Sequence, residues 1–118
     1  MDIATSWSTE TGTRVAFNGA MAKLIGRLGD SPHYLLTYFT EEYSTEELHQ
    51  ALASLPLSVK VHGCSSCLGV MTEDGMHSEE GRALGLFGIR DKRGAYGVGA
   101  APMESVRGLW RGLPWQRP

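Results

Sequence analysis

Apolar positions in the first third of the chain follow a helical period. Four large side chains recur at steps of three and four residues, which places them on one helix face. They are Phe17, Met21, Leu24 and Leu28. Gly29 comes next and is a typical C-terminal stop. The pattern predicts a helix over residues 11–28, preceded by a loosely alternating strand over residues 3–8.

A second helix has the clearest start signal in the sequence. Ser44 and Glu47 have the spacing of a capping box, in which each side chain accepts a hydrogen bond from a free backbone N–H group. The apolar positions that follow share one face: Leu48, Ala51, Leu52 and Leu55. Pro56 then ends the pattern, because proline cannot continue a helix.

Apolar runs between and after these helices predict strands. His33–Phe39 is dense in aliphatic and aromatic residues, which is typical of a central strand covered on both faces. Residues 57–63 alternate apolar and polar positions, as a strand with one wet face does. Residues 82–90 predict another buried strand, and the glycine-rich residues 95–100 predict a further one.

The remaining segments read as turns and a short final helix. Residues 64–67 form a Cys-Ser-Ser-Cys turn, and a short stretch at 68–71 is followed by a turn at residues 73–75. Met103, Val106 and Trp110 predict a short last helix. The element order predicts an α/β fold whose mixed sheet begins with parallel βαβαβ crossovers and ends in antiparallel strands, with the helices packed on it.

Length and charge narrow the classes of function. The 118 residues fit a single domain, expected over residues 1–111, with an irregular tail over residues 112–118. Eleven Lys and Arg against thirteen Asp and Glu give a formal charge of -2, so no basic field is available for nucleic acid or an anionic membrane. The first residues lack a basic region before an apolar run, and no apolar run could span a bilayer. We therefore expect a cytoplasmic protein.

Cys64 and Cys67 offer two kinds of chemistry. A Cys-x-x-Cys pair can act in thiol redox exchange when a helix start lowers the pKa of its first thiol. Leu68-Gly69 is a poor helix start, so packing at a strand end is the favoured interpretation and redox activity the alternative. Zinc would need four ligands, and His62, Cys64 and Cys67 leave only His77, which the sequence places in a loose polar loop. We expect no metal and no cofactor.

Catalytic motifs are incomplete, so the candidate site rests on position in the sheet. Ser65 and Ser66 lack a nucleophile elbow, since Cys67 stands where its second glycine belongs. Ligands of open α/β sheets bind at the carboxyl ends of the strands. There, small residues and free N–H groups could hold a small polar ligand. The predicted ligand-binding residues are Thr40, Glu41, Gly63, Cys64, Ser65 and Ser66.

The turn after Val61 carries a resemblance to the FIST sensory domains, which are intracellular signal-transduction modules. The matching stretches are a helix at 17–28, Pro32-His-Tyr-Leu-Leu-Thr-Tyr-Phe39, a helix at 48–56, Val61-His-Gly-Cys-Ser-Ser66, Asp74-Gly75 and a strand at 83–89. The similarity runs from about residue 3 to about residue 101. Where the family continues Ala-Gly-Glu after the turn, this sequence has Cys67-Leu68-Gly69.

The resemblance implies a non-enzymatic sensory domain that binds a small polar or amino-acid-like ligand. Because the family domain is about twice as long, this chain is expected to be a truncated, stand-alone version. A shortened sheet leaves an edge strand and an apolar face uncovered, and the tail adds Trp110, Leu113 and Trp115. We therefore expect a homodimer that has no nucleic-acid or membrane partner. The main alternatives are a thiol redox protein and a structural partner-binding fragment.

Overall fold

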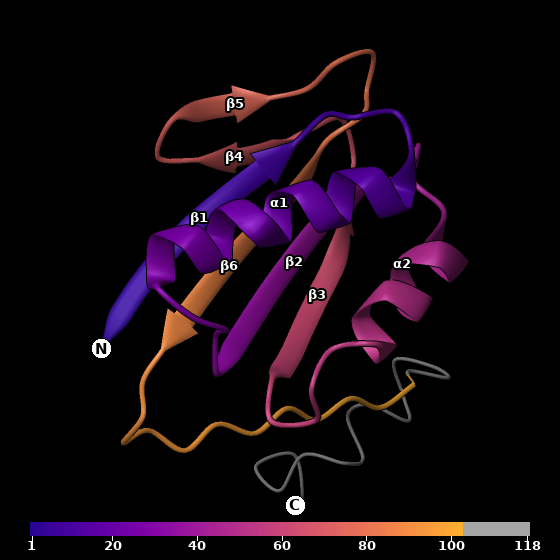
Figure 1. The fold of residues 1–118 in the computed structure, drawn as a ribbon. Helices are drawn as coiled ribbons and strands as arrows, with labels where there is room; N and C mark the ends of the chain where they lie inside the picture. Colours follow the sequence, from indigo (N-terminus) through magenta and orange to yellow (C-terminus); the bar gives the residue numbers. More distant parts are fainter. Residues whose placement is uncertain (103–118) are drawn as a thin grey trace, which may run out of the picture.

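The structure is a computed structural model, and it describes residues 1–102. Its elements follow one another as β1 (Asp2–Ser8), α1 (Thr13–Leu28), β2 (Tyr34–Thr40), α2 (Thr45–Ala53), β3 (Lys60–Ser66), β4 (Val70–Thr72), β5 (Gly75–His77) and β6 (Leu84–Arg90). The fold is a mixed α/β fold, as the element order predicts, with two helices packed against a mixed sheet (Figure 1).

The main sheet has four strands in the order β1-β6-β2-β3. β6 runs antiparallel to both of its neighbours, whereas β2 and β3 pair in parallel. β6 therefore separates β1 from β2, so the two strands that α1 connects are not hydrogen-bonded to each other. The last long strand of the sequence thus occupies an inner position of the sheet.

α1 lies across one face of the sheet and supplies much of the core (Figure 1). The four side chains predicted to share a helix face are all buried. Gly29 ends the helix with a φ of 88°, and its N–H donates to the Ile25 carbonyl. The helix starts at Thr13, two residues later than the periodicity predicts. The Ser6 hydroxyl, on the same face of the sheet, donates to the Ala20 carbonyl at 2.7 Å.

α2 begins at the predicted signal, but only half of the capping box forms. The Ser44 hydroxyl accepts from the Glu47 N–H at 3.2 Å, while the Ser44 N–H donates to the Thr13 hydroxyl at 2.9 Å instead of to Glu47. Tyr43 is buried, and its hydroxyl donates to the Glu10 carbonyl at 2.7 Å. Burial raises the pKa of this phenol. Two tertiary hydrogen bonds therefore anchor the start of α2 to the first residue of α1 and to the segment before it.

Two strand predictions need correction. β3 begins at Lys60 instead of residue 57, because the Val59 N–H donates to the Pro56 carbonyl and closes a turn there. It then continues through Ser66, so the expected turn at 64–66 is part of the strand. Residues 95–100 form no strand, although the sequence predicts one. Interior glycines weaken strands, and no strand within residues 1–102 pairs with this segment.

The expected loose loop around His77 is a second, two-stranded sheet. β4 and β5 form a hairpin that turns at Gly75, where φ is 118°. His77 is 8% exposed, and its ring stacks on Trp7 with the ring centroids 3.9 Å apart. The hairpin therefore lies over β1, on the side of the main sheet opposite to the helices.

β2 is a central strand, but it is fully covered on one face only. Leu35 and Thr37 point toward the helices and are buried, whereas Tyr38 points the other way and is 38% exposed. Neither helix within residues 1–102 is long and apolar enough to cross a membrane. The expected last helix, the tail and the three residues named for self-association, Trp110, Leu113 and Trp115, lie outside the described residues.

Candidate functional site

The predicted strand-end residues do come together at one end of the parallel strand pair. Thr40 is the register partner of Ser66, and Phe39 is the partner of Ser65. Glu41 follows β2 directly and is exposed. Gly63 lies further back in β3, opposite Thr37.

Several polar groups at this strand end are already engaged within the protein. The Thr40 N–H donates to the Ala83 carbonyl at 3.0 Å, and the Thr40 hydroxyl accepts from the Ala83 N–H at 3.1 Å. The Ser66 hydroxyl donates to the Gly69 carbonyl at 2.5 Å. Thr40 and Ser66 therefore close the ends of their strands, which leaves the exposed Glu41, Cys64 and Ser65 as the accessible side chains of the predicted site.

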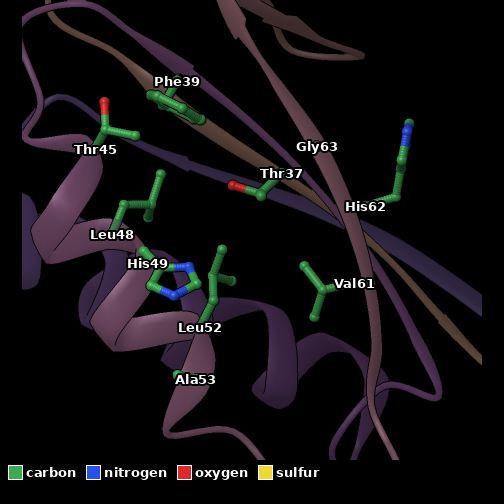
Figure 2. Close-up of a pocket in the computed structure, with 10 residues that line it drawn as sticks. All are labelled: Thr37, Phe39, Thr45, Leu48, His49, Leu52, Ala53, Val61, His62 and Gly63. Atoms are coloured by element: carbon green, nitrogen blue, oxygen red, sulfur yellow. The ribbon is translucent and has the colours of Figure 1, made fainter. Parts of the chain in front are cut away.

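A better-formed concavity lies beside this strand end, between α2 and the strands β2 and β3. This α2–β3 groove has a volume of about 430 Å³. Its lining residues, drawn in Figure 2, are Thr37, Phe39, Thr45, Leu48, His49, Leu52, Ala53, Val61, His62 and Gly63. Four of them are large apolar side chains, so most of the wall is apolar, as is usual for small-molecule sites.

One polar atom in the groove has no partner. Thr37 is 2% exposed, and within residues 1–102 its hydroxyl makes no hydrogen bond. Figure 2 shows the Thr37 oxygen directed from the strands toward α2. Buried hydroxyls nearly always have a partner, since burying one without a hydrogen bond costs about 1–3 kcal/mol. The groove therefore contains an unused hydrogen-bonding group on a mostly apolar wall.

Close packing of β2 and β3 explains why residue 63 is a glycine. A Cβ atom placed at Gly63 would lie 2.3 Å from the Thr37 carbonyl oxygen and 2.6 Å from the Thr37 methyl carbon. Any side chain there would displace Thr37. Close approach of the neighbouring strand is thus a structural reason for glycine at this position of the predicted site.

Besides Thr37, the polar residues that line the groove are Thr45, His49 and His62. Both histidines are exposed. His49 comes from α2 and lies beside the groove, whereas the side chain of His62 points from β3 away from α2 (Figure 2). Sequence reasoning examined His62 only as a metal ligand and did not single out Thr37 or His49. A polar residue at an inward position of an apolar strand is the signal that could have identified Thr37.

The other residues considered for redox or metal chemistry do not form a site within residues 1–102. Cys64 and Cys67 are both free and exposed. His77 is occupied by its stack on Trp7 and by a 2.7 Å hydrogen bond with the Thr72 hydroxyl. Within residues 1–102, no three His, Cys, Asp or Glu side chains gather closely enough to hold a metal ion.

Comparison with known protein families, with curated proteins and with solved structures finds no match to this chain.

Proposed function

We propose that this chain is a non-enzymatic small-molecule-binding domain of the sensory type, with its ligand in the α2–β3 groove. The observation that carries the proposal is the unpartnered Thr37 hydroxyl, buried on the wall of an apolar groove. A ligand group that bonds this hydroxyl would remove the cost of leaving it unpaired. The resemblance to FIST domains, drawn from the sequence motifs, points to the same class of function.

The lining of the groove suggests the chemistry of the ligand. Leu48, Leu52 and Val61 would contact an apolar body, while Thr37 would bond one polar group. His49, on the α2 side of the groove, could contact a second polar group. An amino-acid-like molecule with an apolar side chain has this combination of features. It keeps the expected ligand class but moves the binding position from the strand end to the groove.

Thermal stability in the presence of amino acids tests the proposal. Leucine and phenylalanine serve as the apolar probes, with serine and glutamate as polar comparators. A ligand at 100 times its dissociation constant stabilises a fold by about 2.7 kcal/mol, which raises Tm by several degrees for a domain of this size. We expect the apolar probes to raise the Tm of the wild-type protein and the polar comparators to leave it unchanged.

Two variants locate the site. Thr37→Val removes the hydroxyl but nearly preserves the shape, so it should abolish the ligand-induced shift without lowering the Tm of the unliganded protein. Replacement of both Ser65 and Ser66 by alanine tests the strand end and should leave the ligand-induced shift intact. A shift that survives Thr37→Val but disappears in the double variant would return the site to the strand end. If no probe shifts the wild-type Tm, the proposed ligand class is wrong.

A further inference from the structure

The two edges of the main sheet differ in how well they are protected. On β1, Arg27 of α1 donates to the Thr5 carbonyl, and the Thr5 hydroxyl bonds to Glu73 of the hairpin turn. The Arg27 side chain therefore engages a backbone carbonyl of this edge, and the Glu73 side chain lies beside the same residue. Such blocking is a common protection of edge strands, because their free backbone groups can pair with another chain.

Among the described residues 1–102, none gives the β3 edge comparable protection. The Lys60 N–H donates to the carbonyl of His33, the residue just before β2. This bond determines which residues of β3 direct their backbone groups toward β2. Since alternate residues of an edge strand bond to its neighbour, Val61, Gly63 and Ser65 direct their N–H and C=O groups away from β2. Within residues 1–102, no hydrogen bond outside the ladder is made by these three residues. Most of the strand is exposed.

We propose that β3 pairs antiparallel with β3 of a second copy of this chain, so that the two four-stranded sheets join into one. A two-fold axis beside Gly63 would place Gly63 opposite the partner's Gly63 and Val61 opposite the partner's Ser65. Each of these residues directs its backbone outward, so each opposed pair exchanges two N–H···O bonds. An interface of this kind is isologous and closes as a dimer.

The sequence of β3 suits this particular register. Gly63 is the middle residue of the seven in the strand, so a two-fold axis there pairs the full length of β3. Lys60 would lie opposite the partner's Ser66, and His62 opposite the partner's Cys64. In this register no charged side chain lies opposite the same side chain of the partner. Like charges directly opposite each other would destabilise a symmetric strand pair.

This proposal does not depend on a ligand in the α2–β3 groove, because it rests on backbone groups of the edge. Sedimentation of the full chain over a range of concentrations tests it first. We expect a dimer for the wild type and for Ser65→Ala, which keeps the backbone N–H. Ser65→Pro removes an N–H that points away from β2, so it should leave the fold intact and give a monomer.

Disulfide crosslinking tests the register without the use of proline. In a Cys67→Ser background, His62→Cys would place a thiol opposite the partner's Cys64. Opposed residues of a non-hydrogen-bonded pair lie about 4.5 Å apart between Cα atoms, which suits a disulfide. Air oxidation should then give a covalent dimer on a non-reducing gel. Lys60→Cys is the matched control, since it faces the partner's Ser66 and should give little covalent dimer.

Three results would overturn the proposal. The first is a wild-type chain that stays monomeric at every concentration. This result would overturn the proposal even if hydrogen exchange showed that another part of the chain protects the Val61, Gly63 and Ser65 amides. The second is a dimer that survives Ser65→Pro. The third is a dimer in which both cysteine variants crosslink equally, which would place the contact elsewhere. A monomer that gains protection at these amides only on binding an extended peptide would assign the edge to a peptide partner.

Discussion

The two faces of the main sheet differ in how completely they are covered. On the helix side, cross-strand neighbours such as Leu35, Gly88 and Ala4 form continuous rows beneath α1. On the other side, which we call the open face, the rows contain Ile3, Thr5, Trp7, Tyr34, Leu36, Tyr38, Lys60, His62, Cys64, Gly85, Phe87 and Ile89. The hairpin of β4 and β5 covers the row that contains Gly85. Val70 of the hairpin lies so close to it that a Cβ atom at Gly85 would be 3.2 Å from a Val70 methyl carbon.

The difference separates the part of the molecule that holds the fold from the part that is free to contact other molecules. Domains are normally built from at least two complete layers. The helix side meets this condition, since its side chains belong to one buried cluster. Within residues 1–102, the open face is covered by a short hairpin and, at one corner, by Tyr96, and Leu36, Phe87 and Ile89 remain partly exposed. Substitutions of similar size should therefore have unequal effects on the two sides.

The largest expected effect is loss of a core side chain on the helix side. Leu24 is fully buried between α1 and the sheet, so Leu24→Ala should lower the free energy of unfolding by about 2–5 kcal/mol. Ile89→Ala is the matched change on the open face and should cost less than half as much, because its side chain is already partly exposed. Urea unfolding of both variants measures the difference. Equal losses would mean that the open face is covered in solution.

Two glycines of β6 give a closer comparison on a single strand. Gly88 faces α1, where a Cβ atom would lie 2.9 Å from a Leu24 methyl carbon and 3.0 Å from a Leu28 methyl carbon. Gly85 faces the hairpin. Overpacking a core costs about 1–3 kcal/mol, so Gly88→Ala should destabilise the protein by an amount in this range. Gly85→Ala should cost less, because Val70 lies on a two-stranded hairpin that can shift.

Thermal unfolding of the two alanine variants measures this second comparison. Replacing glycine by alanine also stabilises by about 0.4–1 kcal/mol through the unfolded chain where the conformation allows it, so Gly85→Ala could be close to neutral. A greater loss at Gly85 than at Gly88 would show that the hairpin is held more rigidly than the helix.

Much of the helix side could be predicted from the sequence. The apolar spacing from Phe17 to Leu28 and the start signal at Ser44 are local patterns, and both helices form where these patterns place them. The inner position of β6 could not be predicted, because strand order depends on contacts between segments far apart in the sequence. Residues 95–100 show the same limit, since the sequence predicts a glycine-rich strand there but no strand within residues 1–102 pairs with them.

The candidate site was predicted only in part. The sequence placed Gly63 and its neighbours at the end of a strand beside β2, and Thr40 and Ser66 do lie together there. It could not show that the Thr40 and Ser66 hydroxyls are engaged by Ala83 and Gly69, because these bonds depend on how the chain returns to the sheet. The same holds for Thr37. That its hydroxyl lacks a hydrogen-bond partner within residues 1–102 can be seen only once the surrounding side chains are placed.

The smallest expected effect concerns one corner of the open face. Tyr96 lies near Tyr34, with their ring centroids 5.9 Å apart, and its hydroxyl donates to the Asp91 carboxylate at 3.0 Å. This hydrogen bond lowers the pKa of Asp91 below its ordinary value of 3.8. Desolvation, followed by the bond to Asp91, raises the pKa of Tyr96 above its ordinary value of 10.0.

The signs of these two shifts define the pH window in which the bond stabilises the fold. A carboxyl group with a lowered pKa contributes stability above its unfolded pKa and loses it as the pH falls through the folded pKa. A phenol with a raised pKa contributes stability below 10.0 and loses it as the pH rises through its folded pKa. Tyr96→Phe keeps the ring near Tyr34 but removes the hydroxyl. The Tm of the wild type should therefore exceed that of Tyr96→Phe by a small, constant amount near neutral pH, and the difference should disappear in acid below pH 3.8 and in base above pH 10.0. A difference that persists unchanged in acid would mean that Asp91 is not the acceptor that holds Tyr96 at this corner.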